Sequence, residues 1–221
     1  RLVMWGLAQD HIRWNPVFQD LAEIGGQLDY AFAPFVKIEA LNQLAETVEL
    51  PSGFNLVVRW QPGDIRAGVS DLAVYDYAKE HGFKIFRNKD LHLKLFVYPD
   101  DKAFLTSGNL TGRGLGTQES RNLEVGVPVT LGPGDWSQIY TIIEDSQEVT
   151  QEMVDWLREH ASPEKSESTI PPEPEWEPAG SFSITQLPAT QSPDALFDLY
   201  SRQDSLTTEE SRQLGQDLAT F

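Results

Sequence analysis

Short apolar runs of strand length alternate with stretches of helical spacing through the first 130 residues. LDYAFAPFV at 28–36 fits a buried strand, and in 38–50 the apolar residues recur every three or four positions, as on one face of a helix. A turn, QPGD, closes the next strand, and a hairpin and a last strand end the series. The expected strands are 28–36, 55–60, 83–86, 91–98, 103–106 and 122–129, and the expected helices are 38–50 and 71–81. Alternating strands and helices that end in a hairpin predict an α/β fold, with helices packed on a mixed sheet.

The pattern changes beyond residue 132. Segments 136–144 and 149–159 have amphipathic helical spacing, whereas 162–180 holds five prolines, five glutamates and few apolar residues. N-cap signals, among them TTEES, precede helical spacing in 192–201 and 207–221. We therefore expect four parts: a folded domain at 1–130, a helical extension at 131–160, a Pro/Glu-rich linker at 161–180 and a small acidic helical appendage at 181–221.

The formal net charge of −17 belongs mainly to the C-terminal part. Residues 1–130 contain 13 Lys and Arg against 16 Asp and Glu, whereas 131–221 contain 4 against 18. Between Arg59 and Arg121, ten basic residues outnumber eight acidic ones, so this stretch is the part of the chain suited to a phosphate. The simplest interpretation of the acidic part is a solvated tail. The alternative is a regulator of access, which repels nucleic acid or occupies a basic groove on another protein.

The chain contains no cysteine, which excludes disulfides, thiolate metal sites and a cysteine nucleophile. No apolar run approaches the ~20 residues that a membrane-spanning helix needs. The first 14 residues also lack the pattern of a signal peptide. We therefore expect a soluble, cytoplasmic protein that does not act with a membrane.

A small set of polar residues gathers around the predicted hairpin. His92 and Lys94 lie two positions apart on a strand, so their side chains share one face. An imidazole beside an ammonium is favourable mainly when an anion sits between them. The returning strand delivers Ser107 and Asn109 at its end, and Glu124 in the last strand is placed to orient the imidazole. These residues offer a nucleophile or base, a positive charge and neutral donors around one point.

HLKLFVYPDDKAFLTSGNLT followed by NLEVGV resembles the HxK signature of the phospholipase D superfamily, which is His-x-Lys, a short hairpin, Gly-Ser-x-Asn and a later Glu. The matching positions are His92, Lys94, Ser107, Asn109 and Glu124. The sequence departs from the signature at Thr106, where glycine is usual, and at Pro99, where the family has aspartate. The upstream segment VVRWQPGDIRAGVSDL resembles more narrowly the nuclease domain of phospholipase D-type restriction endonucleases. The resemblance covers about residues 24–130 and implies a phospholipase D-like domain with the acidic appendage added.

The resemblance implies phosphodiester cleavage without a metal or other cofactor. His92 would attack phosphorus and form a phosphohistidine, while Lys94 and Asn109 stabilise the non-bridging oxygens, Ser107 donates a supporting hydrogen bond and Glu124 orients the imidazole. A second histidine must protonate the leaving oxygen. The chain has one HxK, so the resemblance also implies a homodimer with one composite site.

Three functions compete. The favoured one is a DNA endonuclease of a restriction or other defence system. The alternatives are a hydrolase of phospholipids or small phosphodiesters, and an inactive pseudo-nuclease subunit that recruits a helicase or ATPase partner. Arg59, Trp60 and Arg121 are the candidate substrate-binding residues, although Trp60 also fits packing in the core.

Overall fold

The computed structural model describes residues 12–118, 121–161, 171, 173–176, 207 and 210. The chain divides into two compact units, Arg1–Gly180 and Ser181–Phe221. In the second unit, the Thr207 backbone N–H donates to the Glu210 carboxylate (2.8 Å), and the Glu210 N–H donates back to the Thr207 hydroxyl oxygen (3.3 Å). This is a capping box at the TTEES signal. Most of the predicted linker, the whole predicted helix 192–201 and the rest of the predicted helix 207–221 lie outside the described residues.

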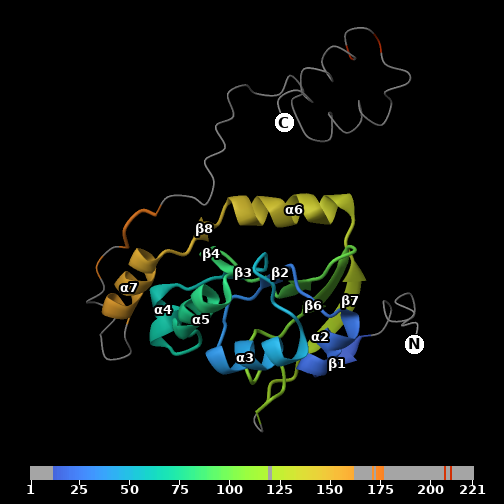
Figure 1. Ribbon diagram of the computed structural model, residues 1–221, viewed down its shortest axis with the longest axis horizontal. Helices are drawn as coiled ribbons and strands as arrows, with labels where there is room; N and C mark the ends of the chain where they lie inside the picture. Colours follow the sequence, from blue (N-terminus) through green and yellow to red (C-terminus); the bar gives the residue numbers. More distant parts are fainter. Residues whose placement is uncertain are drawn as a thin grey trace. The chain divides into compact units, whose positions relative to one another are not determined.

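The first unit is built on a mixed sheet, which has eight strands within the described residues (Figure 1). The order across the sheet is β1-β7-β6-β5-β2-β3-β4-β8. The pairs β2–β3 and β3–β4 are parallel, and the other pairs are antiparallel. The strands are β1 (Arg13–Trp14), β2 (Tyr30–Phe32), β3 (Asn55–Val58), β4 (Lys84–Arg87), β5 (Leu95–Val97), β6 (Lys102–Thr106), β7 (Val125–Thr130) and β8 (Gln147–Glu148).

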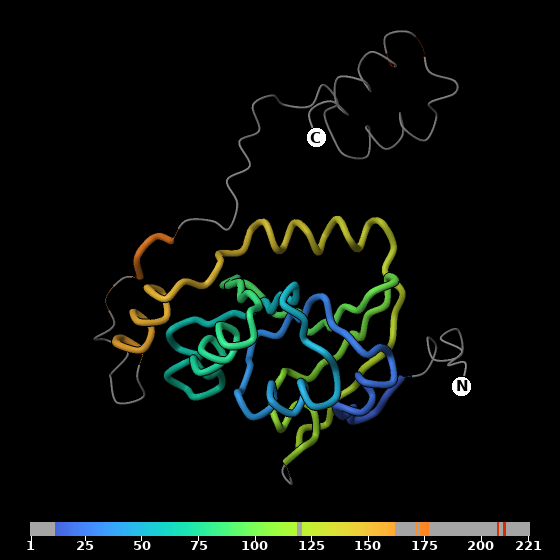
Figure 2. Tube along the Cα trace, in the orientation of Figure 1, coloured from blue at the N-terminus to red at the C-terminus, as the bar shows by residue number. Residues whose placement is uncertain are grey.

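Helices cover both faces of this sheet (Figure 2). On one face, Leu21, Leu41 and Leu157 of three helices share a buried core with Phe96 of β5. On the other face, Ile139 of a single helix packs in a second core, over β2 and β5. The helices are α2 (Phe18–Ile24), α3 (Ile38–Thr47), α4 (Pro62–Arg66), α5 (Ala73–His81), α6 (Pro133–Glu144) and α7 (Gln151–His160). The predicted α/β fold, a mixed sheet flanked by helices, is confirmed.

Two helices begin with the same sequence, Pro-Gly-Asp. In α4 the Asp64 carboxylate accepts from the Gln61 N–H (3.1 Å), and in α6 the Asp135 carboxylate accepts from the Gly132 N–H (2.7 Å). The proline stands in the first turn of each helix, where no N–H is required. The prediction of a simple turn at QPGD was therefore wrong, because the aspartate caps a helix.

The strand that carries the predicted site is shorter than expected. Leu95 is the first residue of β5, and it pairs with Phe32, the last residue of β2. Beyond Phe32 the chain bends at Pro34, which has no N–H to donate, and residues 91–94 lie outside the ladder. On its other side, this chain keeps one bond, from the Thr106 N–H to the Lys94 carbonyl (3.1 Å).

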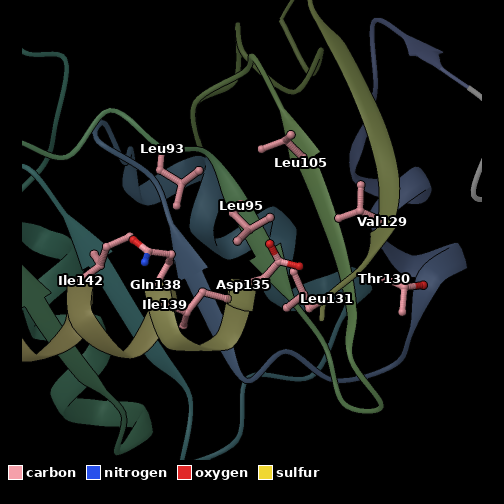
Figure 3. Close-up of a pocket in the computed structure, with 10 residues that line it drawn as sticks. All are labelled: Leu93, Leu95, Leu105, Val129, Thr130, Leu131, Asp135, Gln138, Ile139 and Ile142. Atoms are coloured by element: carbon pink, nitrogen blue, oxygen red, sulfur yellow. The ribbon is translucent and has the colours of Figure 1, made fainter. Parts of the chain in front are cut away.

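The three leucines of 91–95 pack on the α6 side of the sheet. Leu93 and Leu95 line an apolar pocket together with Ile139 and Ile142 of α6 (Figure 3). Leu91 is buried in the same core. His92 and Lys94 alternate with these leucines, a spacing that favours the opposite side, away from α6.

Candidate active site

The predicted catalytic residues meet at one edge of the sheet, where the parallel strands β2, β3 and β4 end. The pairing of Phe32 with Leu95 places the chain before β5 at this edge. The pairing of Thr106 with Gly126 places the end of β6 and the start of β7 there as well. The carboxyl ends of parallel strands are the usual location of ligand sites in α/β sheets.

His92 and Lys94 are in direct contact. The Lys94 ammonium donates to the His92 carbonyl oxygen (2.8 Å) and lies 3.4 Å from both ring nitrogens. Lys94 is buried, whereas the His92 side chain is exposed. The arrangement therefore presents an accessible imidazole with a fixed positive charge beside it.

The protonation of Lys94 depends on its surroundings. Burial lowers the pKa of Lys94 below its ordinary value; the nearby Glu124 carboxylate raises it, and the Arg59 guanidinium lowers it. An anion bound at this ammonium would favour the charged form, so a phosphate and the proton on Lys94 stabilise each other.

Ser107 and Glu124 form a pair beside this contact. The Ser107 hydroxyl donates to a Glu124 carboxylate oxygen (2.5 Å) and accepts from the Val125 N–H (3.0 Å). The other Glu124 oxygen accepts from the Asn122 side chain (3.0 Å). Glu124 stands before β7 and not within the last strand, which corrects the predicted strand start at residue 122. Its carboxylate bonds to Ser107 and Asn122 and so ties the end of β6 to the start of β7.

Asn109 is positioned by a tightly packed glycine turn. Its side-chain oxygen accepts from the Phe35 N–H (3.4 Å), which leaves the amide NH₂ as the donor of this side chain. A Cβ on Gly108 would lie 2.4 Å from the Gly114 carbonyl oxygen, so this approach requires glycine. Thr106, which departs from the family signature, stabilises this turn. Its hydroxyl donates to the Val125 carbonyl (3.0 Å) and accepts from the Gly108 N–H (3.1 Å).

The structure separates two of the predicted substrate-binding residues, Arg59 and Trp60. Arg59 stacks on the Phe35 ring (4.7 Å) and binds both carboxylate oxygens of Asp64 (2.9 and 2.5 Å), which raises the pKa of Arg59. The positive charge of Arg59 lowers the pKa of Lys94, so Arg59 lies near the candidate active site. Trp60 is fully buried and has no surface with which to contact a substrate. This corrects its assignment as a substrate-binding residue.

A cationic hollow adjoins Asn109 and was not predicted from the sequence. It is lined by Phe35, Lys37, Asn109, Arg113 and Asn122, among others. Lys37 is held there by Asp71 (2.5 Å) and by the Gly68 carbonyl (3.1 Å). Its members come from three segments far apart in the chain, so no local pattern reveals it. Arg121 is exposed, and its side chain passes close to Gly116 in the loop before Asn122.

The other described histidines lie at helix ends. The ring of His81 stacks on Tyr77 (3.8 Å) and its Nδ1 meets the Tyr77 carbonyl (2.9 Å). His160 does the same with Trp156 at the end of α7. Within the described part of the chain, His92 is thus the histidine at the sheet edge. No group of three or more His, Asp or Glu suited to a metal ion was found among these residues.

Comparison with known proteins yields structural neighbours but no sequence relative. No family model matches the chain. No curated protein matches it either. The structure is similar to Nuc from Salmonella typhimurium, a phospholipase D family member, over 64% of this chain and 97% of that one, with 12% identity and a TM-score of 0.46. It is also similar to TrmBL2, an archaeal chromatin protein with a novel mode of DNA binding, over 67% of this chain and 57% of that one, with 11% identity and a TM-score of 0.38. At these values the likeness assigns no function.

None of the described helices combines the length and the apolar character that crossing a membrane requires.

Proposed function

We propose that this chain cleaves phosphodiesters, with DNA as the substrate, by covalent catalysis at His92. The observation that carries the proposal is the contact of an exposed His92 imidazole with the buried Lys94 ammonium, 3.4 Å away, at the sheet edge that also holds Asn109. An accessible nucleophile beside a fixed cation and a neutral donor suits a reaction in which charge develops on phosphate oxygens.

In the first step a His92 ring nitrogen attacks phosphorus. The P–N bond forms as the bond from phosphorus to the leaving oxygen breaks, and that oxygen takes a proton from a general acid. Lys94 and the Asn109 amide donate to the non-bridging oxygens. In the second step the group that acted as the general acid, now deprotonated, takes a proton from water; the water oxygen bonds to phosphorus as the P–N bond breaks, and both the His92 imidazole and the general acid are regenerated. No metal ion takes part in either step.

The general acid in this proposal is His92 of a second copy of the chain. The described part of one chain brings one histidine to this edge, while the other described histidines are engaged at helix ends. Two copies related by a two-fold axis would place two imidazoles on opposite sides of one phosphate.

The cationic hollow beside Asn109 supports a polymeric phosphodiester as the substrate. Lys37 and Arg113 line it together with Asn109, and such cations suit a contact with a neighbouring phosphate of the strand. The GVSDL segment, on which the resemblance to restriction endonucleases depends, supports this hollow, because Gly68 and Asp71 hold Lys37. A role in restriction or another defence system is proposed on that resemblance.

The test is cleavage of plasmid, single-stranded DNA and RNA in EDTA, with phosphatidylcholine vesicles as a lipid substrate. We expect DNA cleavage by the unaltered chain, none by His92→Ala and full cleavage by the matched control His81→Ala. Cleavage of the lipid but of neither nucleic acid would show that the substrate is a phospholipid and not DNA. The absence of cleavage of every phosphodiester would favour the inactive pseudo-nuclease.

A further inference from the structure

A short acidic segment, 173–176, lies against the end of β4, beyond the site described above. One Glu173 oxygen accepts from Arg87 Nη1, and the other lies 2.8 Å from Lys89 Nζ. Trp176 secures the segment: its indole donates to Glu173 (3.3 Å), and its carbonyl accepts from the Gln147 side chain (2.7 Å). Two cations therefore hold the two oxygens of one carboxylate.

Arg87 has more donors than this carboxylate uses. Its side chain is fully buried. Its Nε and Nη2 have no hydrogen-bond partner within the described part of the chain. A buried guanidinium is costly unless it is paired, and its planar fork suits an anion with several oxygens. One carboxylate oxygen satisfies it incompletely, which points to a larger anion such as a phosphate.

The carboxylate itself is held as an anion. Burial would raise the pKa of Glu173, but hydrogen bonds and charges from Arg87 and Lys89 outweigh burial and lower it. The pair thus stabilises negative charge at this position. Asp90 and Asp145 also line the surrounding hollow, so its preference for an anion depends on Arg87 and Lys89.

The pair is joined to the sheet edge that carries His92. The Lys89 carbonyl accepts from the side chain of Gln61 (2.8 Å), the residue that precedes α4 in the connection from β3. Lys89 and His92 are three positions apart, so their Cα atoms are separated by at most ~11 Å in an extended chain. Successive phosphates of one strand advance by only ~3.4 Å along a duplex axis, so one strand can reach both places.

We propose that Arg87 and Lys89 form a subsite for a phosphate of the substrate strand near the one cleaved at His92, and that Glu173 occupies this subsite when DNA is absent. The inference rests on the proposed function, because it takes DNA as the substrate. The acidic segment then competes with the substrate within its own chain. DNA binding must release Glu173, and removal of its charge opens the subsite.

The experiment measures binding of a fluorescent single-stranded 12-mer to the full chain at low salt, in a His92→Ala background so that the DNA stays intact. We expect Glu173→Gln to tighten binding about tenfold, equivalent to ~1.4 kcal/mol. Glu175→Gln is the matched control, since it removes the same charge from an exposed side chain two positions away. Adding Lys89→Gln to Glu173→Gln should abolish the gain.

A second variant, Trp176→Ala, releases the segment without changing its charge and should tighten binding in the same direction. Equal effects of Glu173→Gln and Glu175→Gln, or a gain that survives Lys89→Gln, would overturn the subsite. The binding readout requires no turnover. A chain that binds as expected but cleaves nothing would therefore retain the subsite while disproving the nuclease.

Discussion

At the residue scale, the buried Lys94 ammonium is the group whose state decides the charge of the site. Burial lowers its pKa, so Lys94 loses its proton at a lower pH than an exposed lysine, whose pKa is about 10.4. Because the charged form stabilises the phosphate oxygens, kcat/KM should fall as pH rises through this lowered pKa.

Lys94→Arg tests whether Lys94 causes the fall in kcat/KM at high pH, since a guanidinium stays protonated throughout the pH range in which a lysine loses its proton. The alkaline limb of the kcat/KM profile should move to higher pH, whatever the loss in absolute rate. An identical alkaline limb in Lys94→Arg would assign that limb to another group.

Asn109 supplies one neutral donor, and its removal isolates that contribution. Asn109→Ala should lower kcat about a hundredfold, which is the scale of losing one preorganised donor to a developing negative charge. The thermal midpoint should change little, because the Asn109 side chain has one long hydrogen bond, to Phe35 (3.4 Å). A large loss of stability with unchanged kcat would give Asn109 a structural role instead.

At the element scale, the turn after β6 positions Asn109 through the contact of Gly108 with Gly114. A Cβ at Gly108 would lie 2.4 Å from the Gly114 carbonyl oxygen, so Gly108→Ala should destabilise the fold by about 1–3 kcal/mol and lower activity with it. Gly63→Ala is the control, since nothing lies within 4 Å of that position and α4 tolerates alanine. Thermal unfolding of both variants measures the difference.

The sequence was sufficient to predict the elements whose apolar spacing is regular, and the common location of His92 and Lys94. It was insufficient to predict a strand boundary that is set by the end of the neighbouring strand. The ladder of β5 stops at Leu95 because β2 ends at Phe32, which no pattern within 91–98 reveals. The bond from Ser107 to Glu124 was not predicted because 17 positions separate the two residues along the chain. Trp60 was ambiguous in sequence because burial depends on the whole core.

At the scale of the whole molecule, the proposed mechanism requires two copies of the chain. If each composite site needs His92 from both subunits, mixed dimers are inactive. Adding an equal amount of His92→Ala to a fixed amount of unaltered protein should then lower its DNA cleavage to about half after subunit exchange. Adding His81→Ala instead should cause no loss. Unchanged activity after exchange with His92→Ala would show that each chain acts alone.

The central claim is that His92 becomes covalently bound to phosphorus. The most direct measurement is a rapid denaturing quench of the protein with radioactively labelled DNA in EDTA, followed by mapping of the labelled peptide. We predict an adduct on His92 that is labile in acid and stable in alkali, and no adduct in His92→Ala. Cleavage that requires added magnesium and proceeds without any protein adduct would contradict the mechanism.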